Sequence, residues 1–155
     1  MLVKDVMTHE PLACDPHMTA DRAVRLMQDH NIGFLPVVKN IRGYIRLAGV
    51  VTDRDLCLRV LGADLQPHKA PIELCLTPDP IACKPTDTLE AALSLMDQHQ
   101  VRRLPVVDNS DRLMGVITLS DIARSKLLDP EMLVHTLRRV NSRKKSKILA
   151  FSHAH

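Results

Sequence analysis

Aromatic residues and glycine are scarce in this sequence, which has two Phe, one Tyr, no Trp and five Gly among 155 residues. The core must therefore be aliphatic, and the glycine-rich phosphate loops of many nucleotide enzymes are absent. The four cysteines form no Cys-x-x-Cys pair, so neither a zinc ribbon nor a disulfide framework is indicated. No apolar run approaches the length of a membrane helix, and no signal-peptide pattern opens the chain. We therefore expect a cytoplasmic protein without a membrane partner.

Catalytic patterns are also missing. No Ser or Cys nucleophile stands in a recognisable motif with a His partner, and no Walker loop occurs. Cys14 and Cys83 occupy matching positions, as do His30 and His99, but metal-ligand spacing is absent around them. We expect the thiols to be small buried residues and the imidazoles to lie at helix C-termini. The sequence thus predicts neither an enzyme nor a metal site.

The composition is that of an ordinary globular protein with a basic C-terminal region. Hydrophobic residues make up 45% and charged residues 25%, and the net charge is +3. Lys and Arg are crowded into residues 138–147. Such a run is usually a solvated helix end, so it does not favour a nucleic-acid partner. The alternative is a contact with a partner protein, a nucleic acid or an anionic membrane surface.

The sequence contains two diverged copies of one unit. When residues 3–38 are aligned with residues 72–107, 14 of 36 positions are identical, several times the number expected from composition alone. The shared segments include Pro-x-Ala-Cys and Leu-Pro-Val-Val. After three extra residues in the first copy, residues 49–56 align with residues 115–122. We interpret this pattern as a tandem duplication.

Each copy predicts the order β-α-β-β-α, a mixed α/β (α+β) fold. In the first copy the expected elements are an extended piece, a helix, two strands and a helix at residues 12–14, 20–30, 34–38, 44–51 and 53–61. In the second copy they fall at residues 81–83, 89–99, 103–107, 112–117 and 119–127. The expected organisation is a first repeat, a linker, a second repeat, and a C-terminal helix with a basic tail, at residues 1–61, 62–71, 72–128 and 129–155. Helix starts are expected after Thr19, Thr88 and Asp129.

The sharpest shared feature is a Thr-x-x-Asp at the junction of a strand and a helix. It occurs as Thr52 to Asp55 in the first copy and as Thr118 to Asp121 in the second. One interpretation is a capping box, which suits any helix start. The other is a ligand site, because a carboxylate can accept both hydrogen bonds of a ribose diol and a helix N-terminus favours phosphate. The repetition at equivalent positions favours the second interpretation without deciding it.

With these motifs the chain resembles a tandem CBS-domain pair (a Bateman module), in particular the stand-alone bacterial type. The matching features are Asp-Val-Met-Thr at 5–8, the two Leu-Pro-Val-Val strands, and the two Gly-Val-(Val/Ile)-Thr segments at 49–52 and 115–118. The resemblance implies two repeats related by a pseudo-twofold axis, with two clefts between them. It also implies a non-enzymatic regulatory module that binds an adenosine-type ligand such as AMP, ADP or ATP, needs no cofactor, and forms a flat homodimer through its helices. Its effector protein is unknown.

The resemblance also implies which residues bind the ligand. Asp55 and Asp121, beside Thr52 and Thr118, would hold the ribose. The adenine slot would be lined by Leu12, Ala13 and Ile32 in one copy and by Ile81, Ala82 and Val101 in the other. A basic residue just before Leu-Pro would reach the phosphates.

The two copies differ at the phosphate position. Arg103 precedes Leu-Pro in the second copy, whereas the first copy has Phe34 there and carries Arg54 inside its Thr-x-x-Asp. We therefore expect the cleft of Arg103, Thr118 and Asp121 to be the better nucleotide site. The alternative is a protein-interaction module of stress or dormancy physiology, with vestigial clefts that bind no nucleotide.

Overall fold

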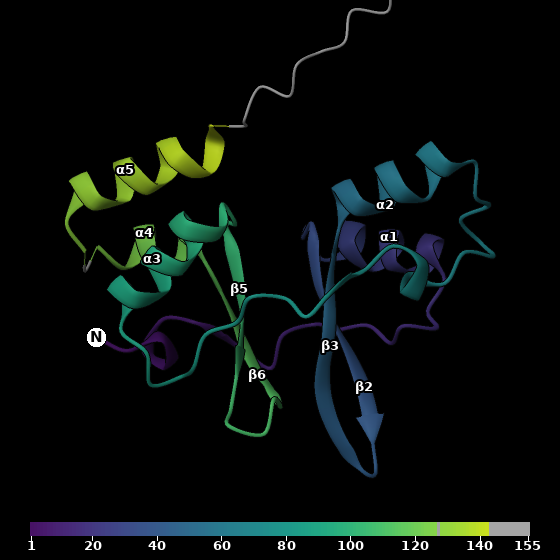
Figure 1. The fold of residues 1–155 in the computed structure, drawn as a ribbon, viewed down its shortest axis with the longest axis horizontal. Helices are drawn as coiled ribbons and strands as arrows, with labels where there is room; N and C mark the ends of the chain where they lie inside the picture. Colours follow the sequence, from purple (N-terminus) through teal and green to yellow (C-terminus); the bar gives the residue numbers. More distant parts are fainter. Residues whose placement is uncertain (127, 143–155) are drawn as a thin grey trace, which may run out of the picture.

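The computed structural model describes residues 1–126 and 128–142, which form two halves side by side (Figure 1). Helices and strands of the first half are α1 (Ala20–Asp29), β2 (Phe34–Ile41), β3 (Tyr44–Thr52) and α2 (Asp53–Arg59). Those of the second half are α3 (Leu89–His99), β5 (Arg103–Val107), β6 (Leu113–Thr118), α4 (Leu119–Ser125) and α5 (Pro130–Asn141). Two short strands, β1 (Thr8–His9) and β4 (Thr77–Pro78), complete the sheets.

The short strands cross between the halves. β1 lies near the start of the first copy but pairs with β6 of the second, with Thr8 opposite Val116. β4 lies near the start of the second copy but pairs with β3 of the first, with Thr77 opposite Val50. The result is two three-stranded antiparallel sheets, ordered β1-β6-β5 and β2-β3-β4. This reciprocal exchange is the pairing pattern of two repeats related by approximate twofold symmetry.

The two hydrophobic cores follow the same exchange. Val3 and Met7, from the start of the chain, are buried in the core of the second half. Ala70, Ile72 and Cys75, which precede β4, are buried in the core of the first half. Both cores are aliphatic, as the scarcity of aromatic residues predicts. Neither core is complete without residues that lie next to the other copy in the sequence.

The helices and strands lie close to their expected positions, with five main differences. β2 ends at Ile41, three residues beyond the expected end at residue 38. The extended pieces at residues 12–14 and 81–83 form only single parallel bridges, Cys14 to Val37 and Cys83 to Val106. Each copy has a proline on both sides of this cysteine, and proline cannot donate to a longer ladder. α2 ends at Arg59 and is followed by a 3-10 turn, Leu61–Ala63. α4 ends at Ser125, and the last residue of the expected helix, 127, lies outside the described residues. β1 and β4 were not predicted.

The expected threonine caps are confirmed at three of four helices. The hydroxyls of Thr52, Thr88 and Thr118 accept hydrogen bonds from Asp55 N, Ala91 N and Asp121 N respectively. Thr19 stands at the N-cap of α1, but its side chain accepts no such bond. Within the described residues, no helix is both long and apolar enough to cross a bilayer.

Glycine in the two Gly-Val-(Val/Ile)-Thr segments permits the exchange of β1 and β4. A Cβ atom added at Gly115 would lie 2.7 Å from the Thr8 carbonyl oxygen and 2.6 Å from the Met7 sulfur. One added at Gly49 would lie 2.8 Å from the Thr77 carbonyl oxygen. A backbone atom cannot move aside as a flexible side chain can. Any larger residue at these positions therefore pushes the exchanged strand away.

We predict that Gly115→Ala destabilises the protein by about 1–3 kcal/mol, the range for overpacking a tight interior contact. Gly62→Ala is the control, because a Cβ atom there meets only ordinary van der Waals contact at 3.7 Å. Urea unfolding followed by circular dichroism measures both. Equal stability of the two variants would show that the close approach of β1 to β6 is not needed.

Candidate functional site

A cleft of about 810 Å³ lies between the two halves, and residues from both repeats line it. The second repeat contributes the start of β5, the end of β6 and the first turns of α4, including Arg103, Thr118 and Asp121. The first contributes the segment after β1 and the turn between α1 and β2, including Leu12 and Ile32. The volume is within the range of about 300–1,000 Å³ that is common for small-molecule sites. We call this the Asp121 cleft.

Asp121 and Thr118 form a complete capping box at the mouth of the cleft. Asp121 Oδ2 accepts hydrogen bonds from Thr118 N at 2.9 Å and from Thr118 Oγ1 at 2.7 Å, and Asp121 N donates to Thr118 Oγ1 at 3.1 Å. The threonine hydroxyl is thus fully used within the motif. Asp121 Oδ1 is the oxygen that remains, and Arg124 Nη2 lies 2.5 Å from it. The Arg124 side chain is 75% exposed, so it can move when a ligand arrives.

The first repeat has the same local geometry. Asp55 Oδ2 accepts from Thr52 N at 2.9 Å and from Thr52 Oγ1 at 2.8 Å, and Asp55 N donates to Thr52 Oγ1 at 3.1 Å. Arg59 Nη2 lies 3.5 Å from Asp55 Oδ1. The capping role of Thr-x-x-Asp therefore holds in both repeats. A ligand role must come from what surrounds each motif.

The surroundings of Asp121 are basic. The cleft is lined by three guanidinium groups, Arg102, Arg103 and Arg124, against two carboxylates, Glu10 and Asp121. The Arg103 guanidinium carbon lies over the Phe34 ring, 6.0 Å from its centre. Phe34 and Arg103, which occupy the equivalent position before Leu-Pro in the two copies, thus meet in one cleft. This arrangement can attract an anionic ligand and offers its phosphates planar hydrogen-bond donors.

The start of α4 offers few free N–H groups to a phosphate. Leu119 N donates to Arg102 O at 2.9 Å, and Asp121 N is used by Thr118. α4 is also only seven residues long, so its macrodipole is short. The arginines, rather than the helix end, are therefore the phosphate-binding groups that this cleft provides.

One side of the Asp121 cleft is apolar, and it uses part of the expected adenine slot. Leu12 is 39% exposed although it is a large aliphatic residue. It lines the cleft together with Ile32, Phe34 and Val116. The remaining expected residues are not lining residues of this cleft: Ala13, Thr52, Arg54, Asp55, Ile81, Ala82 and Val101. Val101 packs against the core of the second half.

Several lining residues were not predicted from the sequence. Arg124 follows Asp121 by three residues, about one helical turn, and this spacing in the sequence could have indicated that the two side chains meet. Glu10 and His30 come from the first repeat, and Leu137 and Asn141 come from α5. No sequence pattern placed α5 beside a ligand site, because its position depends on how it packs on the second repeat.

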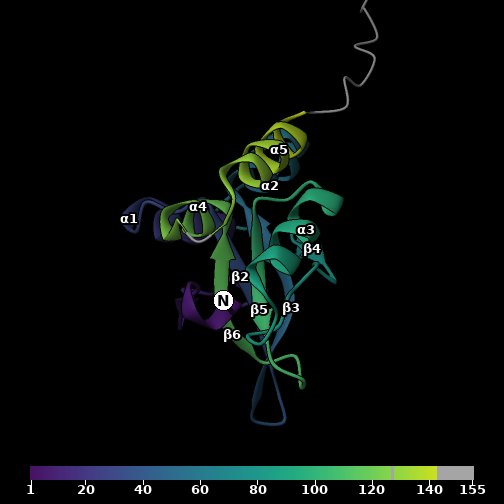
Figure 2. The ribbon, with the colours of Figure 1, turned by 90° about the vertical axis from the view of Figure 1, so that its left-hand side faces the viewer.

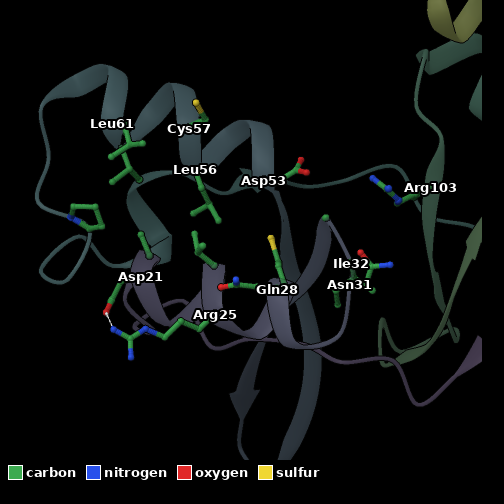
Figure 3. A pocket seen from close by; sticks show the side chains of 16 residues that line it. Asp21, Arg25, Gln28, Asn31, Ile32, Asp53, Leu56, Cys57, Leu61 and Arg103 are labelled. Carbon is green, nitrogen blue, oxygen red and sulfur yellow. Dashed lines mark ion pairs between the residues drawn. The ribbon is translucent and has the colours of Figure 1, made fainter.

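A second cavity, of about 780 Å³, lies between α1 and α2. Figure 3 shows Leu56 and Leu61 on its apolar side, Asp21 paired with Arg25, and Arg103 reaching its edge from the second half. Arg25 Nη2 lies 3.9 Å from Asp21 Oδ2. We call this cavity the α1–α2 groove. It adjoins the Asp121 cleft, since residues 31–33 and Arg103 line both.

The cysteines do not form a reactive centre. Cys14, Cys75 and Cys83 are buried and Cys57 is exposed, and all four are free thiols. Burial raises the pKa of Cys14 and of Cys83 to about 12 and also raises the pKa of Cys75. At neutral pH these three thiols are protonated and poor nucleophiles. Within residues 1–126 and 128–142, no group of three His, Cys, Asp or Glu side chains could hold a metal ion.

A family model of the CBS domain matches residues 3–62 and again residues 72–127. The chain belongs to the CBS-domain family. Among curated relatives, the CBS domain-containing protein YhcV of Bacillus subtilis is 37% identical over 125 residues, covering 81% of this chain and 85% of YhcV. Inosine-5'-monophosphate dehydrogenase of Methanocaldococcus jannaschii is 32% identical over 126 residues, which cover 81% of this chain but only 23% of that enzyme. In that relative, therefore, most of the enzyme lies outside the matched module.

Solved structures of CBS pairs share this fold. CBSX2 of Arabidopsis thaliana, in complex with AMP, has a TM-score of 0.69 and 30% identity, covering 81% of this chain and 96% of that one. The CBS pair of MJ0100, in complex with 5'-methylthioadenosine and S-adenosyl-L-methionine, has a TM-score of 0.71 and 27% identity, covering 81% and 94%. Both neighbours bind adenosine-type ligands. The fold is thus that of a CBS pair.

We predict that iodoacetamide modifies Cys57 long before the three other cysteines in the native protein. The reason is that the thiolate is the nucleophile, and the three buried thiols are both inaccessible and protonated at pH 8. Peptide mass mapping after timed alkylation, at low protein concentration, measures the order. Early modification of Cys14 or Cys83 would show that these thiols are accessible and reactive, and would contradict the conclusion that they are buried, unreactive groups.

Proposed function

We propose that this protein is a non-catalytic regulatory module that binds an adenosine phosphate in the Asp121 cleft. The observation that carries the proposal is the meeting of Asp121, an apolar slot and three arginines in one cavity between the repeats. The neighbours CBSX2 and MJ0100 hold AMP and S-adenosyl-L-methionine with methylthioadenosine respectively. The output passes through a partner protein that responds to the bound state.

In this proposal Asp121 holds the ribose through Oδ1. Oδ2 is already satisfied by Thr118, so Oδ1 is the oxygen available to a diol. Arg124 now contacts Oδ1 and turns from the carboxylate to a phosphate when the ligand enters. A charge-assisted hydrogen bond lost from a buried ribose is worth about 1.5–3 kcal/mol.

The arginines set the ligand class. Arg102, Arg103 and Arg124 face the cleft together and favour a phosphorylated adenosine over S-adenosylmethionine, whose sulfonium group is positive. The adenine ring occupies the slot beside Leu12, Ile32 and Phe34. The Asp55 motif lacks this set of groups, and neither described cavity includes Asp55. Its site is therefore the weaker one in our proposal.

We predict that AMP, ADP or ATP binds the protein, that S-adenosylmethionine binds more weakly, and that Asp121→Ala raises the Kd of the nucleotide at least about tenfold. Asp55→Ala is the matched control, because both variants lose the same two hydrogen bonds that the threonine donates to the carboxylate and about 1 kcal/mol of stability. Isothermal titration calorimetry measures the affinities.

Two outcomes would count against the proposal. Equal loss of affinity in Asp121→Ala and Asp55→Ala would remove the asymmetry between the sites. Absence of binding by the wild type, checked by thermal shift because a ligand of the folded state must raise stability, would favour the interaction module with vestigial clefts.

We also propose a homodimer that forms through the α1–α2 groove. Val24 in this groove is 46% exposed, whereas its counterpart Leu93 is 1% exposed and lies on α3, the helix on which α5 packs. Asp21, Asp53 and Arg25 line the groove together with apolar residues, so in a twofold contact Arg25 of each copy can face a carboxylate of the other. α5 occupies the corresponding face of the second repeat. The proposed dimer contact therefore uses only the first repeat of each chain, and it is smaller than the contact in a flat dimer in which all four repeats take part.

We predict that Val24→Arg raises the dimer dissociation constant at least about tenfold, because it puts a charge at the centre of an apolar contact. Val134→Arg is the matched control, since Val134 lies on α5 with a similar exposure of 44%. Sedimentation velocity over a range of protein concentrations measures both. A wild type that stays monomeric, or equal weakening by both variants, would refute the proposed interface.

A further inference from the structure

α5 has no counterpart after the first repeat and lies beyond the matched CBS repeats, which end at residue 127. It lies over α3 and α4 of the second half (Figures 1 and 2). Leu133 packs against the second core, and Thr136 is buried with 3% exposure. Arg139 Nε lies 3.0 Å from Asp97 Oδ1, close enough for an ion pair although not aligned as a hydrogen bond. α5 is thus held on the second repeat by specific contacts.

The same contacts cannot form on the first repeat. The position equivalent to Asp97 is Gln28, which carries no charge to pair with Arg139. The residue equivalent to Leu93 is the smaller Val24. The sequence of α5 therefore matches the second repeat, which is also the repeat that carries Asp121.

The C-terminal half of α5 reaches the Asp121 cleft. Leu137 and Asn141 line the cleft beside Arg102, Arg103 and Arg124. The Arg102 guanidinium donates a hydrogen bond to Asn141 Oδ1, which leaves the amide nitrogen of Asn141 as a donor. Leu137 is 40% exposed, so part of its side chain is accessible to a ligand in the cleft. In Figure 1 the end of α5 points toward the gap between the two halves.

We propose that α5 is part of the ligand site, with Leu137 and Asn141 contacting the nucleotide, and that ligand binding and α5 docking stabilise each other. The inference rests on the proposed nucleotide function of the Asp121 cleft. A ligand that touches both α5 and the second repeat favours the state in which α5 is docked. By linkage, a docked α5 must favour the ligand by the same factor.

Through this coupling, the binding of the nucleotide changes a part of the surface that a partner protein can contact. α5 is the last described element before residues 143–155, and it carries Arg138 and Arg139. Ligand occupancy therefore changes how firmly this basic end of the protein is held on the second repeat. A partner protein that contacts α5 senses the nucleotide without touching the cleft.

The first test is nucleotide titration of the full chain by calorimetry, with AMP as the probe. Leu137→Ala and Asn141→Ala should each raise the Kd at least about fivefold, the lower end of typical coupling between sites. Val134→Ala is the matched control on the same helix, because Val134 is similarly exposed but is not a cleft-lining residue. It should leave the Kd unchanged. Thermal unfolding checks that all three variants are folded.

The second test is hydrogen exchange with and without saturating AMP. Amides of residues 130–142 should exchange more slowly in the complex, whereas those at the β2–β3 turn, 41–44, should not change. Wild-type binding with an unchanged Kd in both α5 variants, an equal loss in Val134→Ala, or no added protection of α5 would overturn this inference and leave the proposed function standing. Failure of the wild type to bind AMP, ADP and ATP would overturn both.

Discussion

The geometry of the cleft depends on the exchange of short segments between the two repeats. Val3 N donates to Asp87 O at 2.8 Å, and Ile72 N donates to Met18 O at 2.8 Å, so the first residues of each copy are tied by backbone hydrogen bonds to the other copy. Val3 and Ile72 are also fully buried. Separating the repeats would open both cores at once. The space between the repeats is therefore a fixed part of the fold, and the strands and helices that frame it do not have to assemble around a ligand.

The duplication made most of the fold predictable from the sequence, because each helix and strand of the repeat appears twice and the two copies confirm each other. α3 and β5 begin and end at the expected residues. The sequence could not predict β1 and β4, since two exposed or half-exposed residues carry no apolar periodicity. Their partners lie far away along the chain. Gly49 and Gly115 were a signal of a close backbone approach, but nothing local shows which strand approaches.

The candidate site was predictable only in part, for the same reason. Asp121 and Arg103 follow from the motif and from the difference between the copies, and both line one cleft. That Leu12 and Ile32 of the first repeat complete this cleft follows from the tertiary arrangement alone. One difference between the copies, Gly33 in the first and Arg102 at the equivalent position in the second, has a local counterpart. A Cβ atom added at Gly33 would lie 2.6 Å from the carboxylate of Asp53. In the second repeat Leu119 stands at the position of Asp53.

The divergence of the copies has a consistent direction. α5 covers the helix face of the second repeat and lines its cleft, while the corresponding face of the first repeat stays open as the α1–α2 groove. The two surfaces are not independent, because Arg103 and the turn at residues 31–33 belong to both. A ligand that engages Arg103 changes the edge of the groove on which we propose that a second copy docks. A duplicated chain with two equivalent faces could bind in two equivalent ways, whereas in our proposal the second repeat is specialised for the ligand and the first for association.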